Sequence, residues 1–113
     1  MKSNKNYLLH ILESILNIEN FTKNMNEIEF NKDKKTQSAC MREIQIIGEA
    51  SRKLTDDFRE INNAIPWRDI IGMRNRVVHD YFGIDNELIW EVVRKDLPFL
   101  KTGITELINR EPG

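Results

Sequence analysis

The sequence is poor in the residues from which disulfides and metal sites are built. Its 113 residues include one cysteine, Cys40, and two histidines, His10 and His79. A single thiol excludes a disulfide framework, and two lone histidines do not make a cluster of metal ligands. We therefore expect a core or half-buried thiol at Cys40, no bound metal and no other cofactor.

Long apolar runs are absent as well. No stretch approaches the roughly 20 apolar residues that a membrane-spanning helix needs. The first apolar segment is interrupted by His10 and Glu13 in the manner of an amphipathic helix, not of a signal peptide. We expect a cytoplasmic protein with no membrane segment.

Positive charge is not in excess. Seventeen Lys and Arg residues face 18 Asp and Glu residues, and the formal net charge is -1. This balance excludes a globally basic nucleic-acid-binding protein but leaves room for a local basic patch. The length suits one domain with a real core, so we predict a single domain over residues 1–113.

What the sequence does contain is apolar residues at helical spacing, and no segment alternates with the period of a strand. A first amphipathic helix is predicted over residues 5–23. Its apolar stripe consists of Leu8, Ile11, Leu12, Ile15 and Leu16. A polar stretch follows, in which we expect a loop with one short helical turn.

A second long helix is predicted after Asn31 or Asp33, either of which can serve as its N-cap. Gly48 within this helix would let a neighbouring helix come close. The inner face is predicted to consist of Cys40, Ile44, Ile47, Ser51 and Leu54. A short extra helix then starts at Thr55.

A third helix is predicted to begin at Pro66 and to end near Tyr81, before Gly83. Asp85 is a good N-cap for a fourth helix, which Pro98 should kink or break. Together these elements predict an all-α fold, an up-and-down bundle of four main helices plus a short extra helix.

Residues 65–85 concentrate functional groups that a bundle does not need for folding. Arg74, His79 and Tyr81 can supply a phosphate clamp, a proton shuttle and a hydroxyl donor, which suggests phosphoryl-transfer chemistry. On an ideal helix Arg74 and Tyr81 share one face, and Asn75 and His79 share another. Arg74 and His79 would diverge by about 140° and lie about 7.5 Å apart along the axis. A second copy of the helix, related by a two-fold axis, would close that gap.

A plainer interpretation also fits these residues. An arginine and a histidine near a helix end are usually surface residues, and Arg76 with Asp80 would form an exposed ion pair of little energetic value. His10 is then a histidine on a helix surface. Trp67 and Trp90 are expected as core anchors and not as platforms for bases.

The spacing Arg74-x4-His79-x-Tyr81 resembles the R-x4-H-x-Y motif of the HEPN superfamily, specifically the HepT-like ribonuclease toxins that are paired with minimal nucleotidyltransferases. The resemblance extends over nearly the whole chain. The other segments that carry it, in order, are Tyr7-Leu8, Phe30-Asn31, Ile47-Gly48-Glu49-Ala50, Ile65-Pro66-Trp67, Gly72-x-Arg74-Asn75 and Asp96-Leu97-Pro98.

The resemblance implies a HEPN fold and a metal-independent endoribonuclease that acts as a homodimer, with the motif helices of two subunits lining one cleft. It implies the toxin of a type VII-like toxin–antitoxin pair. Arg74 and His79 are then the catalytic pair and Asn75 a supporting residue. Tyr81 is the residue to which a partner nucleotidyltransferase, the antitoxin, would attach AMP.

An RNA substrate would have to be held by a local basic group, since the chain as a whole is acidic. Arg68 and Arg76 are the candidates for that role beside Arg74, together with Arg52 and Lys53. Cleavage through the 2′-OH of the RNA is expected, because no cluster of ligands is spaced to hold a divalent ion. The dimer interface should include the third helix and part of the fourth.

Two other classes of function remain open from the sequence. One is a non-catalytic HEPN module that binds a nucleotide or a partner transferase, with Arg74 and His79 as ligand contacts only. The other is a structural bundle whose only role is to dimerise. Growth arrest that His79→Ala abolishes would favour the ribonuclease over both.

Overall fold

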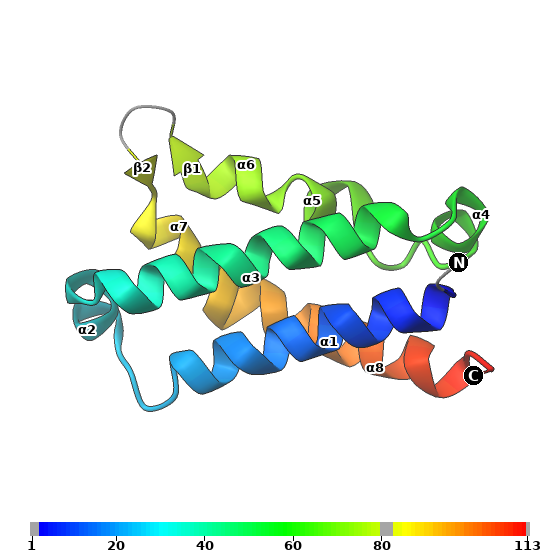
Figure 1. Cartoon of the computed structure of the whole chain (residues 1–113), viewed down its shortest axis with the longest axis horizontal. Coiled ribbons are helices and arrows are strands. Elements are labelled where there is room, and N and C mark those ends of the chain that lie inside the picture. The colour runs from blue at the N-terminus through cyan, green and yellow to red at the C-terminus, as the bar shows by residue number, and fades with distance from the viewer. Residues whose placement is uncertain (1–2, 80–82, 113) are drawn as a thin grey trace.

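The computed structural model describes residues 3–79 and 83–112, with only the backbone described at residues 79, 83 and 84. Successive long segments of the chain run in alternate directions. The helix α3 (Lys34–Lys53) lies between α1 (Asn4–Phe21) on one side and the short helices α5 (Trp67–Ile71) and α6 (Met73–Val77) on the other (Figure 1). The segment from α7 (Asn86–Glu91) to α8 (Leu97–Arg110) lies behind them. The expected all-α, up-and-down bundle is confirmed.

The two longest helices are α1 (Asn4–Phe21) and α3 (Lys34–Lys53). Asp33 caps α3, because its side chain accepts a hydrogen bond from the backbone N–H of Thr36 at 3.0 Å. The predicted stripe of α1 is wrong at one position, since Leu16 is 44% exposed and Ile18 is buried instead. The predicted inner face of α3 is buried at all five of its positions.

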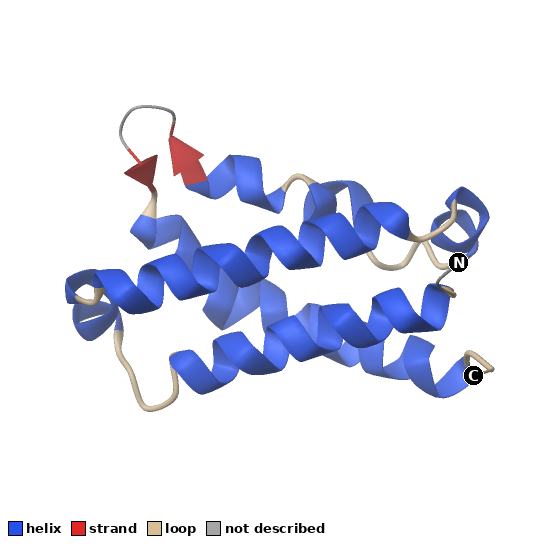
Figure 2. Ribbon diagram, in the orientation of Figure 1, coloured by secondary structure: helices blue, strands red, loops and turns tan. Residues whose placement is uncertain are grey.

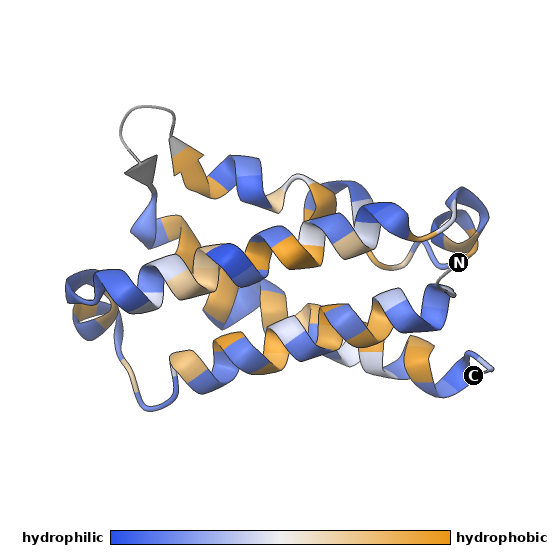
Figure 3. Ribbon diagram, viewed as in Figure 1, coloured by the Kyte–Doolittle hydropathy of each residue, from blue (hydrophilic) through white to orange (hydrophobic). Residues whose placement is uncertain are grey.

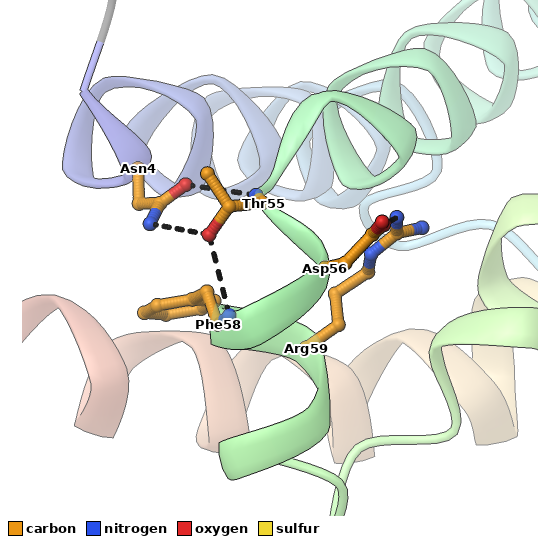
Figure 4. Close-up of polar contacts among 5 residues, drawn as sticks. All are labelled: Asn4, Thr55, Asp56, Phe58 and Arg59. Carbon is orange, nitrogen blue, oxygen red and sulfur yellow. Dashed lines mark hydrogen bonds and ion pairs between the residues drawn. The ribbon is translucent and has the colours of Figure 1, made fainter.

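Two short helices, α2 (Glu27–Lys32) and α4 (Asp56–Ile61), turn the chain at opposite ends of α3. A capping box between Asn26 and Glu29 starts α2, which the sequence had suggested only as one helical turn. Thr55 caps α4 through the N–H of Phe58. Asn4 exchanges two hydrogen bonds with Thr55 and so ties the start of α1 to the start of α4 (Figure 4).

The predicted third helix is shorter than expected and is interrupted. It consists of α5 (Trp67–Ile71) and α6 (Met73–Val77), which are joined at Gly72. The chain then enters a small antiparallel hairpin, β1 (Val78–His79) and β2 (Gly83–Ile84), with Val78 opposite Ile84 and residue 79 opposite Gly83. The expectation that the helix reaches Tyr81 is therefore wrong. β-branched Val77 and Val78 favour extended backbone at this point.

The fourth segment contains α7 (Asn86–Glu91), a π-helical turn η1 (Val92–Asp96) and α8 (Leu97–Arg110). Asp85 caps α7 as predicted. The interruption expected at Pro98 takes the form of the wide turn just before it. Proline has no N–H to donate to the carbonyl four residues earlier, and its ring crowds that carbonyl. The wide turn accommodates the proline, and the N–H of Leu97 donates to the carbonyl oxygen of Val92, five residues earlier.

The helices pack around one apolar core, and each long helix shows it as an apolar stripe beside a polar one (Figure 3). Trp67 and Trp90 are both buried, as expected, and the Trp90 ring lies 5.2 Å from that of Phe30. Helices make up nearly all the regular structure, and the hairpin is the only strand pair among the described residues (Figure 2). Within that part of the chain, no helix is both long and apolar enough to cross a membrane.

Candidate active site

Arg74 lies on α6, the short helix that leads into the hairpin. Gly72 joins α5 to α6: its N–H donates to the carbonyl oxygen of Arg68, and its own carbonyl oxygen accepts from the N–H of Asn75. Arg74 is exposed, and its Nη1 donates to the side-chain oxygen of Asn75 at 3.3 Å. The Arg74 and Asn75 side chains are therefore in contact on the exposed surface of α6.

Arg74 and Asn75 form one wall of a cleft of about 450 Å³. We call it the Arg74 cleft. Its opposite wall is the C-terminal half of α3, and its full lining is Gln45, Gly48, Glu49, Arg52, Ile71, Arg74 and Asn75. The cleft thus combines residues that lie more than twenty positions apart in the sequence.

The charges of the Arg74 cleft favour an anion. Two guanidinium groups, those of Arg52 and Arg74, face it together with one carboxylate, that of Glu49. Glu49 is already paired with Arg52 at 2.6 Å, and both side chains are mostly exposed. The side-chain amides of Gln45 and Asn75 add neutral donors. A planar arginine fork beside amide donors is the arrangement that binds phosphate oxygens.

Gly48 lets the two walls of the cleft come close together. A Cβ atom at this position would lie 3.2 Å from the carbonyl oxygen of Ile71 at the end of α5. The close approach that the sequence suggested for Gly48 is therefore present, and the neighbour is the segment that carries Arg74. Any larger residue at this position would move α5 away from α3.

The two arginines that we predicted as RNA contacts do not line the Arg74 cleft. Arg68 faces an adjacent cleft of about 530 Å³ beside Trp67. Arg76 points toward η1, where its Nη2 lies 3.1 Å from a carboxylate oxygen of Asp96. The predicted partner of Arg76, Asp80, lies outside the described residues.

The other motif residues fall at or beyond the hairpin. Residue His79 is on β1, where its backbone pairs with Gly83, and its side chain is not among those described. Tyr81 lies outside the described residues. Because α6 ends at Val77, the ideal-helix comparison of Arg74 with His79 and of Asn75 with His79 does not apply to this chain.

The sequence did not point to the wall of the cleft that α3 supplies. In the sequence Arg52 is one basic residue among several, and no motif includes Gln45. Gly48 and Glu49 belong to a segment of the family resemblance that assigns them no role in a site. One signal was available, since Gln45, Gly48, Glu49 and Arg52 recur at the three- and four-residue spacing of one helix face.

His10, expected on a helix surface, is half-buried on α1 and faces α3.

The described residues contain no cluster of metal ligands. Among residues 3–79 and 83–112, as far as their side chains are described, no three His, Cys, Asp or Glu residues gather as a metal site would require.

Comparison with known proteins identifies relatives over most of the chain. The family described as "Ribonuclease HepT-like" matches residues 11–107. A protein of Thermococcus cleftensis named "Probable ribonuclease HepT" is 44% identical over 88% of this chain and 91% of its own length.

A "Putative RNase" of Caldanaerobacter subterraneus is 36% identical over 98% of this chain and 99% of its own length. A Methanocaldococcus jannaschii protein, named as a gamma-glutamylcyclotransferase and putative RNase, is 48% identical over 95% of this chain, which covers 48% of that protein. No solved structure matches at the same level of significance.

Proposed function

This chain belongs to the HepT-like ribonuclease family, and from that premise we propose that it is an endoribonuclease with its catalytic centre at the Arg74 cleft. The observation that carries the proposal is the cleft itself: Arg74 and Asn75 face the basic end of α3 across a space able to hold a phosphodiester. Residues 1–113 would act as one HEPN domain.

The proposed reaction uses the RNA's own 2′-OH as the nucleophile. Its oxygen forms a bond to the adjacent phosphorus, and the bond from phosphorus to the 5′-oxygen of the next nucleotide breaks. One fragment then ends in a cyclic 2′,3′-phosphate and the other begins with a 5′-OH. His79 carries the proton of the 2′-OH to the leaving 5′-oxygen. Arg74 stabilises the extra negative charge of the phosphorane-like transition state. Asn75 holds the Arg74 guanidinium in place.

The test is cleavage of single-stranded RNA by Arg74→Ala and His79→Ala variants. Losing one charge-stabilising donor typically costs on the order of 10²–10³ in rate, so each variant should be nearly inactive with its fold retained. Arg110→Ala, which removes an exposed arginine from the end of α8, is the matched control. Cleavage of an RNA with a 2′-deoxy group at the scissile position, at the normal rate, would contradict the mechanism.

We propose that the reaction needs no divalent ion, because a histidine and an arginine can between them move the proton and offset the charge. Activity should then survive EDTA. Loss of activity in EDTA that added Mg²⁺ restores would count against this part of the proposal and leave the assignment of Arg74 to the site intact.

A homodimer is the second part of the proposal, with the interface on the surface between α5–α6 and η1–α8. Phe99 is 64% exposed there, beside Ile70 and Met73, which supports a surface that a second copy covers. Phe99→Glu should give a monomer in sedimentation, whereas Ile28→Glu, at an equally exposed residue on α2, should not. A wild-type chain that is monomeric and fully active would refute this part.

The third part concerns control of the ribonuclease as the toxin of a toxin–antitoxin pair. A partner nucleotidyltransferase would join the Tyr81 hydroxyl oxygen to the α-phosphorus of ATP, with pyrophosphate leaving. The attached AMP would add bulk and negative charge beside the phosphate site. Mass measurement after incubation with the transferase and ATP tests this. Tyr81→Phe should remain unmodified, and Tyr7→Phe, at the chain's other tyrosine, should be modified normally.

A further inference from the structure

A second cleft adjoins the Arg74 cleft on the other side of α3. It lies between α1 and α3 and measures about 400 Å³. We call it the Arg42 groove. Its polar lining includes Tyr7 and His10 from α1 and Arg42 and Lys53 from α3. None of these four residues belongs to the proposed catalytic centre.

The two clefts adjoin each other at α3. Gln45 and Glu49 line both of them, so the surface of α3 at these residues is their common border. Figure 1 shows the same order, with α3 between α1 and the α5–α6 segment. A ligand that leaves the Arg74 cleft over Gln45 therefore enters the Arg42 groove.

The joint surface of the two clefts is basic, although the chain is not. Its charged side chains are Arg42, Arg52, Lys53 and Arg74 against the single carboxylate of Glu49. The formal charge of the whole chain is -1. Four cations have thus been gathered on one side of an acidic protein, where they would concentrate a polyanion.

The groove offers a second feature besides charge. Tyr7 is half-buried and lines the groove together with Arg42 and Lys53. Aromatic rings next to cations are how single-stranded nucleic acids are held without sequence preference, because every base has a face that can stack. Arg42 and Lys53 are separated by about 16 Å along α3. A single small phosphate ligand could therefore not contact both.

We propose that single-stranded RNA crosses α3, with the cleaved phosphate in the Arg74 cleft and the flanking nucleotides in the Arg42 groove. Arg42 and Lys53 contact flanking phosphates, and Tyr7 stacks on a flanking base. This assignment rests on the proposed ribonuclease function, since it places the scissile phosphate beside Arg74. It adds a binding track that takes no part in the chemistry.

The test compares the double variant Arg42→Ala/Lys53→Ala with Lys34→Ala/Lys35→Ala. Both remove two exposed cations from α3, the second pair from its far end. Binding of a labelled 2′-O-methyl oligonucleotide of about 12 residues, which cannot be cleaved through a 2′-OH, is measured by anisotropy over a range of KCl concentrations. Circular dichroism verifies that each variant is folded.

Each phosphate contact in a single strand contributes about -0.7 to the slope of log K against log salt. Losing Arg42 and Lys53 should therefore make the slope shallower by about 1.4 and weaken binding about 25-fold at 0.1 M KCl. The control pair should leave both quantities unchanged.

Equal slopes and affinities for the two double variants would overturn the track, as would a wild type that does not bind the oligonucleotide. Displacement of the RNA by polyglutamate of equal charge would overturn the assignment to nucleic acid. A wild type that binds the oligonucleotide more tightly than the Arg42→Ala/Lys53→Ala variant but cleaves no RNA would refute the ribonuclease proposal instead. The two failures are therefore distinguishable.

Discussion

Replacing Gly48 with alanine should push α5 away from α3 and so disturb the Arg74 cleft. The new Cβ would lie 3.2 Å from the carbonyl oxygen of Ile71 and 3.8 Å from that of Ile70. Both are backbone atoms, which cannot turn aside as the end of a side chain can. The end of α5 must therefore move by a few tenths of an ångström, and Arg74 follows it in the chain.

Gly103 in α8 provides a matched control for this change. A Cβ there would lie equally close to a neighbour, 3.1 Å from Cδ1 and 3.2 Å from Cγ1 of Ile65, but both are side-chain atoms. Each Gly→Ala change in a helix interior gains about 1 kcal/mol of helix propensity. Overpacking costs about 1–3 kcal/mol where the neighbour is fixed, and a shifted rotamer costs about 0.5–1.5 kcal/mol.

We therefore expect Gly48→Ala to be less stable than Gly103→Ala by about 1 kcal/mol. For 113 residues the unfolding entropy makes this about 4 °C in Tm. Thermal unfolding followed by circular dichroism measures it. RNA cleavage should fall about tenfold for Gly48→Ala, because small misplacements of a positioning arginine are costly, and should be unchanged for Gly103→Ala. Equal Tm and equal cleavage rates for the two variants would refute the reasoning.

Four further predictions concern buried or capping groups. Ser51→Ala should stabilise the fold by about 1 kcal/mol, because its buried hydroxyl has no hydrogen-bond partner among the residues that the structure describes. Thr22→Val should destabilise it by a similar amount, since the Thr22 hydroxyl donates to the carbonyl oxygen of Ile18 at 2.9 Å, and Tm shifts of the same sign for the two variants would contradict one of these two predictions. Hydrogen bonds from Thr36 lower the pKa of Asp33. Its stabilisation is then present above the unfolded pKa of about 3.9 and is lost as pH falls through the lower folded value. Asp33→Asn should flatten the acid limb of the stability curve, and an unchanged limb would argue against the cap. Burial raises the pKa of Cys40 to about 12, so thiol reagents at pH 8 should label it only after unfolding, and rapid labelling of the folded protein would be inconsistent with this.

The parts of the fold that local chemistry determines could be predicted from the sequence. Asp33, Thr55 and Asp85 all cap the helices assigned to them, because a capping side chain bonds to an N–H only two or three residues away. The inner face of α3 was predicted for a similar reason, since its burial follows from spacing alone. The capping box of Asn26 and Glu29 is likewise a local signal, because its two residues are three positions apart.

The partners of Arg74 could not be predicted in this way. Which residues of α3 stand opposite Arg74 depends on how closely α3 and α5 approach, and that depends on Gly48 packing against a carbonyl group in another segment. The separation of Arg76 from the cleft likewise depends on Asp96, twenty residues further along. Spacing within one helix contains no information about either contact.

Because α6 ends at Val77, the geometry of one continuous helix does not describe the positions of Arg74 and residue 79. The 140° divergence of Arg74 and His79 assumed one continuous helix, but the chain leaves the helix at Val78. The position of residue 79 is set by the pairing of Val78 with Ile84, and the N–H of Asp85 closes the hairpin on the carbonyl of Val77 at 2.6 Å. The need for a second copy therefore does not follow from helix geometry, and the exposed Phe99 surface supports it independently.

A slip of one residue in the hairpin register would turn residue 79 to the opposite face while leaving α6 and Arg74 where they are. Any chemistry that uses both residues thus depends on the register of a hairpin only two residues deep.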